Sequence, residues 1–190
     1  MTDFTREDVI DMIWSARKLV RADLRGIDLN AANLSLANLH NAKLCNSNLN
    51  RADLREANLS EADLSGADLR GLNLNYVSLL GVCLHKAALR GVYLCGAALS
   101  GANLYKAYLS WSSLDIAKMR GADLILANLR DADLTGSDLS RAILVEAKLS
   151  GGQNSLMFFG YASDSEVSSR SGWRPRLKRK NKAVSYGGLA

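Results

Sequence analysis

The hydrophobic pattern of this chain is a leucine at every fifth position from Leu24 to Leu149. Of the 26 positions in this series, all are leucine except Met119. No insertion or deletion breaks the register between these two ends. A short fixed period of this kind predicts a solenoid, in which each unit buries its apolar side only by stacking on its neighbours.

The residues around each leucine predict a short extended segment followed by a bend. The position two before the leucine is Ala in 18 of the 26 blocks and Ser in three, and the position directly before it is Asp or Asn in 15. A small and a large residue two apart on one side follow the β alternation, whereas an α-helix needs a period near 3.6. Because five is odd, a straight strand would turn its next leucine outward. The chain must therefore bend once per block, and the frequent Gly, Asn, Asp and Ser residues tolerate bends.

The tandem array A-(D/N)-L-x-x, as in RADLR at 51–55, resembles the pentapeptide-repeat proteins over residues 21–150. The resemblance implies an all-β fold, a right-handed quadrilateral β-helix with four blocks per coil. The leucine and the small residue two before it would point inward. The 26 blocks then predict about 6.5 coils and, at ~4.8 Å per coil, a rod roughly 30 Å long. The expected core is packed and dry and holds no ligand.

The two ends of the chain differ from the array. Residues 1–20 predict a capping α-helix from about 6 to 19, with Thr5 as N-cap and Asp8 completing a relative of the capping box. Its apolar side, including Trp14, would cover the open end of the rod. Residues 151–161, which contain SLMFFGY, predict a C-terminal cap, and residues 162–190 predict a flexible basic tail because they lack apolar content.

If a coil takes 20 residues, residues 20 apart share a column on the rod surface. The column that begins at Arg25 changes from polar to apolar at Tyr105. With its neighbours, including Tyr108 and Trp111 on the neighbouring side, it predicts an exposed interaction patch made of Tyr105, Tyr108, Trp111, Ile125, Leu126, Ile143 and Val145. Three interpretations of this patch stay open: cover by the chain's own segment 156–161, binding of a partner or a second copy, and a scatter without function. A second cluster (Tyr76, Tyr93, Cys95 and Ile116) is interpreted as local packing, with rings lying flat over Gly96.

The net charge of +5 comes from the tail. Residues 21–150 hold 14 basic and 13 acidic residues, so no basic surface is expected on the rod. The tail carries a candidate anion-binding run, Arg174, Arg176, Lys178, Arg179 and Lys180. Three unpaired cysteines, an N-terminus unlike a signal peptide and the lack of a long apolar stretch favour a cytoplasmic protein.

The sequence predicts neither catalysis nor a cofactor. Its Asp and Asn residues follow the repeat and are expected to hydrogen-bond the backbone at turns. Its two histidines, His40 and His85, fall on different sides of the rod, so no metal site is expected. The leading hypothesis is a non-enzymatic interaction or scaffold protein that binds another protein or itself, as a homodimer.

Two alternative functions remain. The first follows from the family resemblance, since some members protect DNA gyrase by mimicking acidic duplex DNA. The near-neutral body and the alternation of Asp with Arg in RADLR disfavour this function. The second is binding of nucleic acid or an anionic surface through the tail.

Overall fold

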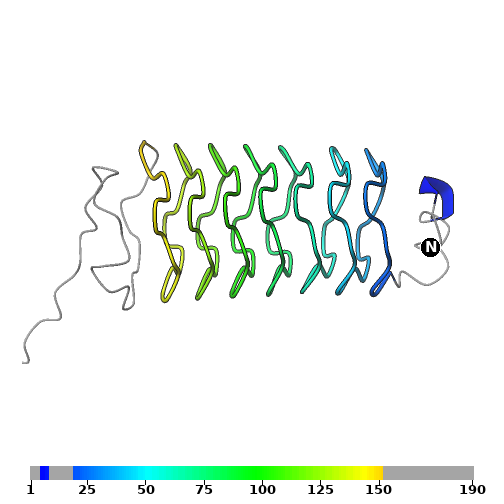
Figure 1. The fold of residues 1–190 in the computed structure, drawn as a ribbon, viewed down its shortest axis with the longest axis horizontal. Helices are drawn as coiled ribbons and strands as arrows, with labels where there is room; N and C mark the ends of the chain where they lie inside the picture. Colours follow the sequence, from blue (N-terminus) through cyan, green and yellow to red (C-terminus); the bar gives the residue numbers. More distant parts are fainter. Residues whose placement is uncertain (1–4, 9–18, 152–190) are drawn as a thin grey trace, which may run out of the picture.

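In the computed structural model, which describes residues 5–8 and 19–151, residues 19–151 form a straight rod of stacked coils (Figure 1). Parallel β-bridges join each paired residue to the one 20 positions further on, from Asp23 with Lys43 to Asn128 with Lys148. A coil therefore takes 20 residues, as the surface columns assumed. Among these residues the bridges are isolated, with one paired residue in each block directly before the leucine, and no longer strand forms.

A tight turn follows every leucine of the rod. The leucine carbonyl accepts a hydrogen bond from the N–H three residues later, as in Ala32 N to Leu29 O at 3.0 Å. The residue two after the leucine has a positive φ, between 50° and 76°, at all 27 such positions from Arg21 to Gly151. A positive φ at the third residue of a hydrogen-bonded turn is the signature of a type II turn. Only ten of these positions are glycine, so the stacked neighbours hold side chains such as Trp111 in a conformation that they rarely adopt alone.

Hydrogen bonds between coils run along each side of the rod. Leu24 N donates to Lys43 O at 2.8 Å, Lys43 N donates to Ala22 O at 2.8 Å, and Gly26 N donates to Cys45 O at 2.9 Å. This pattern repeats from block to block and satisfies the backbone groups that a single coil leaves unpaired. A coil is therefore stable only beside its neighbours.

The core contains the leucine series and the small residues two positions before each leucine. Met119 and Leu79 have at most 1% of their surface exposed, and the alanines of the inner coils are similarly buried. Buried serines replace alanine at three positions, and each hydroxyl donates to the carbonyl of the residue three before it: Ser47 to Leu44, Ser112 to Leu109 and Ser137 to Leu134. The buried hydroxyls are satisfied, so they fit a dry core.

The hydrogen bonding between coils is interrupted at one place, where Leu72 occupies a position that is usually alanine. Leu72 lies one coil above Ala52. The bridge that would join Asp53 to Asn73 is missing from an otherwise regular series. Five backbone hydrogen bonds that the repeat predicts are also missing there, those of the N–H groups of Arg51, Leu54, Glu56, Asn73 and Ser78 to the neighbouring coil. Ala52 is 7% exposed. The larger side chain separates the two coils locally.

At the N-terminus, residues 6–8 are helical. Asp8 N donates to Thr5 Oγ1 at 3.2 Å and Thr5 N donates to Asp8 Oδ2 at 2.8 Å, so the predicted capping pair is confirmed. The hydrogen bond from the Thr5 hydroxyl also lowers the pKa of Asp8. The rest of the predicted helix, the C-terminal cap beyond residue 151 and the basic tail lie outside the described residues.

Candidate interaction surface

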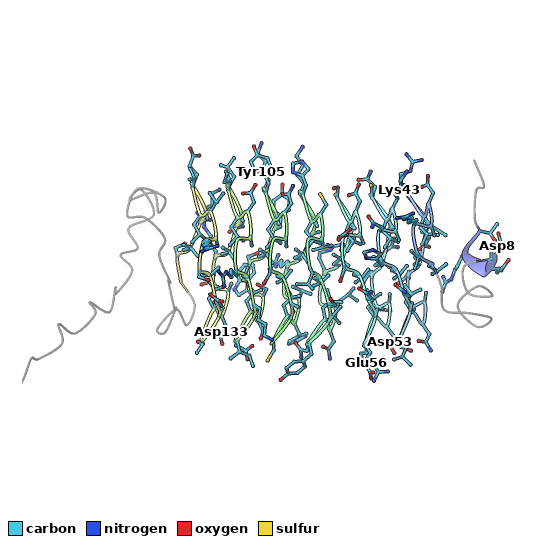
Figure 2. The ribbon with its side chains drawn as sticks, turned by 90° about the horizontal axis from the view of Figure 1, so that it is seen from below. Asp8, Lys43, Asp53, Glu56, Tyr105 and Asp133 are labelled. Atoms are coloured by element: carbon cyan, nitrogen blue, oxygen red, sulfur yellow. The ribbon has the colours of Figure 1, made fainter. Side chains whose placement is uncertain are left out.

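The rod has four faces, each defined by one column of inward leucines. The first face carries Leu24 and every twentieth residue to Leu144, and the second, third and fourth faces begin at Leu29, Leu34 and Leu19. Figure 2 shows Lys43 and Tyr105 on one side of the rod, and Asp53, Glu56 and Asp133 on the opposite side. These are the first and third faces. Residues on either side of each leucine point outward and form the surface.

The Asp and Asn side chains before the leucines have a structural role. In 14 of the 15 such blocks the side-chain oxygen accepts a hydrogen bond from the backbone N–H two residues later, as in Ser60 N to Asn58 Oδ1 at 3.0 Å. The expectation that these residues bind backbone groups at turns is confirmed. These hydrogen bonds stabilise the turns and use the side-chain oxygens as acceptors.

Three of these aspartates are also neutralised by arginine. Arg25, Arg55 and Arg70 each approach an aspartate two residues earlier, with Nη2 to Oδ2 distances of 2.6 Å to Asp23, Asp53 and Asp68. The Nε atom donates to the other oxygen, so each pair is bidentate. The hydrogen bond from arginine lowers the pKa of each of these carboxyls. The alternation of Asp and Arg in the sequence therefore removes acidic character from the surface.

Five of the seven predicted patch residues lie together. Tyr105, Ile125 and Val145 follow one another in a column of the first face, and Ile143 lies in the adjacent column. Leu126 is at the corner between the first and second faces. Ile143 and Val145 are 38% and 36% exposed, whereas Tyr105, Ile125 and Leu126 are half-buried. We call these five residues the apolar stripe.

The other two predicted patch residues lie round the corner on the second face. Tyr108 and Trp111 are 55% and 56% exposed. Trp111 is at the far corner of this face, where the guanidinium carbon of Arg90 lies 4.2 Å from its ring centroid. The seven residues therefore form two adjoining surfaces rather than one patch.

The charge distribution corrects the expectation that the rod has no basic surface. Lys86, Arg90, Lys106 and Arg130 are all exposed on the second face or at its corner with the first. Among the described residues none of these four forms an ion pair, since the three ion pairs all involve other arginines. The near-neutral total conceals this region because most acidic residues lie on other faces or are paired. Asp28 shares the second face but lies three coils away from Lys86 and Arg90, and Asp131 and Glu146 border the region.

A chain of polar contacts on the first face was missed by sequence reasoning. Cys45 Sγ donates to Asp63 Oδ2 at 2.8 Å, Ser65 Oγ donates to Asp63 Oδ1 at 2.5 Å, and Ser65 Oγ lies 3.2 Å from Cys83 Sγ. Burial and the hydrogen bond to Asp63 raise the pKa of the Cys45 thiol to about 11. Two contacts join residues 18 apart, so alignment at a period of 20 does not reveal them. A neutral, hydrogen-bonded thiol is a poor nucleophile.

Next to this chain, aromatic side chains continue toward the apolar stripe. The rings of His85 and Tyr105 stack at 5.3 Å between centroids, and Lys106 Nζ lies 5.0 Å from the Tyr105 centroid. His85 and Lys106 each cover part of the Tyr105 ring, which is half-buried. The stripe therefore begins at a ring that its neighbours hold in place.

The second aromatic cluster packs locally, as predicted. A Cβ atom added to Gly96 would lie 2.5 Å from Cε1 of Tyr76, so the Tyr76 ring lies directly over this glycine. Ile116 covers Gly136 in the same column, with its Cγ2 3.1 Å from the corresponding Cβ position. Tyr76 Oη accepts a hydrogen bond from Cys95 Sγ at 3.8 Å. Glycine here makes room for the side chain of the preceding coil.

The described residues form neither a metal site nor a membrane-spanning helix. No group of three His, Cys, Asp or Glu side chains among them has the arrangement needed to hold a metal ion. None of their helical segments is long and apolar enough to cross a membrane.

The 20-residue coil, the inward leucines and the polar turns define a β-solenoid whose chemistry lies on its outer faces. A family model described as pentapeptide repeats matches the chain in eight copies, over residues 18–51, 52–91, 83–121 and 112–151. The chain therefore belongs to the pentapeptide-repeat family, as the A-(D/N)-L-x-x array predicted. No curated protein matches it significantly over its sequence.

Solved structures show the same fold. HetL, a pentapeptide-repeat protein involved in heterocyst differentiation regulation in the cyanobacterium Nostoc sp. strain PCC 7120, is 36% identical with a TM-score of 0.73. The match covers 77% of this chain and 67% of HetL, and it implies a right-handed β-helix. Rfr23 from the cyanobacterium Cyanothece 51142 is 22% identical over 80% of this chain and 98% of Rfr23, with a TM-score of 0.44.

QnrB1, a plasmid-mediated fluoroquinolone resistance protein, is 18% identical with a TM-score of 0.34. That match covers 70% of this chain and 79% of QnrB1. With TM-scores under 0.5, the likenesses to Rfr23 and QnrB1 carry no argument about this chain.

Proposed function

We propose that this protein is a non-enzymatic interaction protein, in which a rigid β-helical rod presents the apolar stripe to another protein or to a second copy of itself. The observation that carries the proposal is the stripe, because it is a contiguous run of partly exposed apolar side chains along the first face. The other exposed apolar residues of the third and fourth faces include Tyr76 and Ile116, which pack locally on glycines. Contiguous exposed apolar side chains on a folded protein usually mark an interaction site. Pentapeptide-repeat proteins in general act as structural or interaction proteins, which agrees with this role.

The likeness to HetL supports a regulatory role for such an interaction. HetL is described as involved in the regulation of heterocyst differentiation. Regulation by a rod with an exposed apolar surface is simplest when the rod binds a second protein.

The test compares capture and self-association by the rod and by a variant with a polar stripe. Ile125→Asp and Val145→Asp place two charges in the stripe. Asn33→Asp with Asn73→Asp is a control with the same charge change on the third face, where aspartate already occupies the equivalent positions Asp53 and Asp133. The stripe variant should lose the partner, or the dimer measured by light scattering, while the control keeps it. Equal binding by both variants would refute the stripe as the interaction surface.

The gyrase-protecting alternative is disfavoured by the bidentate Asp–Arg pairs, of which the described residues contain three. A mimic of duplex DNA needs a continuous acidic surface, since the phosphate backbone is uniformly negative. We therefore expect no protection in a supercoiling assay with gyrase and a quinolone. Restored supercoiling at stoichiometric rod would overturn this expectation.

We further propose that the chain ends cap the rod, with residues 1–20 and 151–161 covering a β-helix of about 6.5 coils in a cytoplasmic protein. Leu24 and Leu144 belong to the first and last coils but are only 1% and 2% exposed, which supports covered ends. Removal of residues 1–18 should then cause end-to-end association, measured by light scattering. A truncated chain that stays dispersed would contradict the N-terminal cap.

A further inference from the structure

The second face combines exposed cations with exposed aromatic rings. We call Lys86, Arg90, Lys106, Tyr108, Trp111 and Arg130 the basic aromatic surface. Asp68, which shares this face, forms its ion pair with Arg70. The cations of the surface form no ion pair with any acid of the described residues. Unpaired cations on one face attract and orient an acidic partner.

The aromatic residues of this surface are suited to binding a protein. Tyr108 and Trp111 each expose more than half of their surface, and Arg90 lies over the Trp111 ring. Trp, Tyr and Arg are the residue types that most often contribute the largest share of the free energy of binding at protein interfaces. With the Arg90 guanidinium in place, Trp111 is still 56% exposed.

The basic aromatic surface is continuous with the apolar stripe. Leu126 occupies the corner between the two faces, and Lys106 precedes it by one coil in the same corner column. Ile125 lies next to Leu126 along the chain and belongs to the first face. Aliphatic side chains and unpaired cations therefore lie side by side across one edge of the rod.

The presence of both cations and aliphatic side chains on this edge favours an acidic polypeptide over a single-stranded nucleic acid. A single-stranded nucleic acid would use the cations and stack bases on the rings. It would leave the aliphatic part of the stripe, Ile125, Ile143 and Val145, without a suitable contact. A polypeptide with both carboxylates and apolar side chains satisfies both surfaces at once.

We propose that the partner docks on this edge through an acidic amphipathic segment of protein. Its carboxylates pair with Lys86, Arg90, Lys106 and Arg130, and its apolar side chains pack on the stripe and beside Trp111. From Tyr105 to Val145 the stripe extends over two coil steps, about 10 Å, which is roughly two turns of α-helix. This proposal rests on the proposed interaction function and specifies the chemistry of the partner.

The test uses random peptides displayed on phage and selected on the full-length protein. Selected peptides are synthesised, and their affinity is measured by fluorescence anisotropy over a series of salt concentrations. The charge-reversal variant carries Lys86→Glu, Arg90→Glu, Lys106→Glu and Arg130→Glu. A control variant has the same change in net charge on other parts of the rod, with Lys43→Glu, Lys118→Glu, Arg120→Glu and Arg141→Glu.

In both variants the backbone accepts glutamate at the substituted positions that have a positive φ, which are Lys86, Lys106 and Arg141. Glutamate already occupies equivalent positions with a positive φ at Glu56, Glu61 and Glu146. A further variant, Trp111→Ala, is also compatible with the backbone, because alanine occupies the equivalent repeat position Ala31 with a φ of 56°. Circular dichroism confirms that each variant is folded before its affinity is compared.

The expected result is that selected peptides combine Asp or Glu with large apolar residues. Their affinity should fall at least about tenfold with the charge-reversal variant and with Trp111→Ala, and it should weaken as salt rises. The control variant should bind as the wild type does.

Three results would overturn the proposal. Apolar peptides whose affinity ignores charge reversal would reject the acidic partner and leave the stripe as an interaction surface. The absence of any peptide that distinguishes the wild type from the variants would reject the docking edge itself. A single-stranded oligonucleotide that displaces the selected peptides with higher affinity would assign the surface to nucleic acid.

Discussion

The interruption beside Leu72 leads to a quantitative prediction. Replacing Leu72 with Ala gives this position the residue that most blocks have, and it should let the two coils approach. The buried methyl groups that are lost destabilise the protein by about 2–5 kcal/mol in an ordinary leucine-to-alanine change. Five backbone hydrogen bonds are missing at this place, and each recovered bond stabilises the fold by about 0.5–1.5 kcal/mol. The two effects are similar in size and opposite in sign.

We therefore expect Leu72→Ala to change the free energy of unfolding by much less than Leu79→Ala. Leu79 lies in the inward leucine column, and Leu59 N donates to Ser78 O and Leu79 N to Ala98 O, so hydrogen bonds join its block to both neighbouring coils even though the N–H of Ser78 is one of the five that lack their bond. Its replacement recovers no bond and should cost the full ~2–5 kcal/mol. Urea denaturation of the wild type and both variants measures the difference.

Hydrogen exchange provides the local readout. In the wild type the amides of Leu54 and Asn73 should exchange faster than those of Leu34 and Asp53, which donate to the neighbouring coil at 2.8 and 2.9 Å. In Leu72→Ala the amides of Leu54 and Asn73 should become protected. The reasoning is refuted if Leu72→Ala destabilises the rod as much as Leu79→Ala and exchange at Leu54 and Asn73 stays fast.

Two further predictions concern single side chains. Gly96→Ala should displace the Tyr76 ring, because the new Cβ would lie 2.5 Å from it, whereas Gly91→Ala meets no atom within 4 Å. Both changes add the strain of a positive φ, about 1–2 kcal/mol, so only a larger loss for Gly96→Ala, with a shifted Tyr76 NMR signal, agrees with the structure. Cys45 should resist alkylation until the pH approaches the pKa of about 11 of its partly buried, hydrogen-bonded thiol, while an unfolded-state thiol reacts from about pH 8.5. Because the pKa of Cys45 is higher in the folded than in the unfolded state, its contribution to the free energy of unfolding is fully present below pH ~8.5 and is lost as the pH rises toward 11. An alkylation rate at Cys45 that is half-maximal near pH 8.5 would contradict the partly buried, hydrogen-bonded thiol.

The site was only partly predictable from the sequence. Aligning residues at a period of 20 correctly placed Tyr105, Ile125 and Val145 in one column. The alignment also placed Tyr108 and Trp111 on the neighbouring face, and it grouped them with the column as one patch. It also treated charge as a total, so the cations of the second face were overlooked. Side-chain contacts that cross from one column to another, such as Cys45 with Asp63, have no simple sequence period.

By itself the sequence determined the repeat, its period, and which residues point inward. A leucine at every fifth position, a small residue two before it and a polar bend leave only one way to bury the leucines, which is by stacking coils. The Asp and Asn residues were likewise predictable as backbone acceptors, because their partners are two residues away in the chain. Each of these features depends on neighbours that the repeat itself supplies.

Only the tertiary structure decided which side chains of different coils meet and which charges stay unpaired. The Asp68–Arg70 pair removes one charge from the second face, while Lys86 and Lys106 keep theirs. The separation of coils beside Leu72 likewise depends on the alanine one coil below. The physical reason is that contacts between coils depend on the volume and direction of side chains from separate blocks, and these are the residues in which the blocks differ.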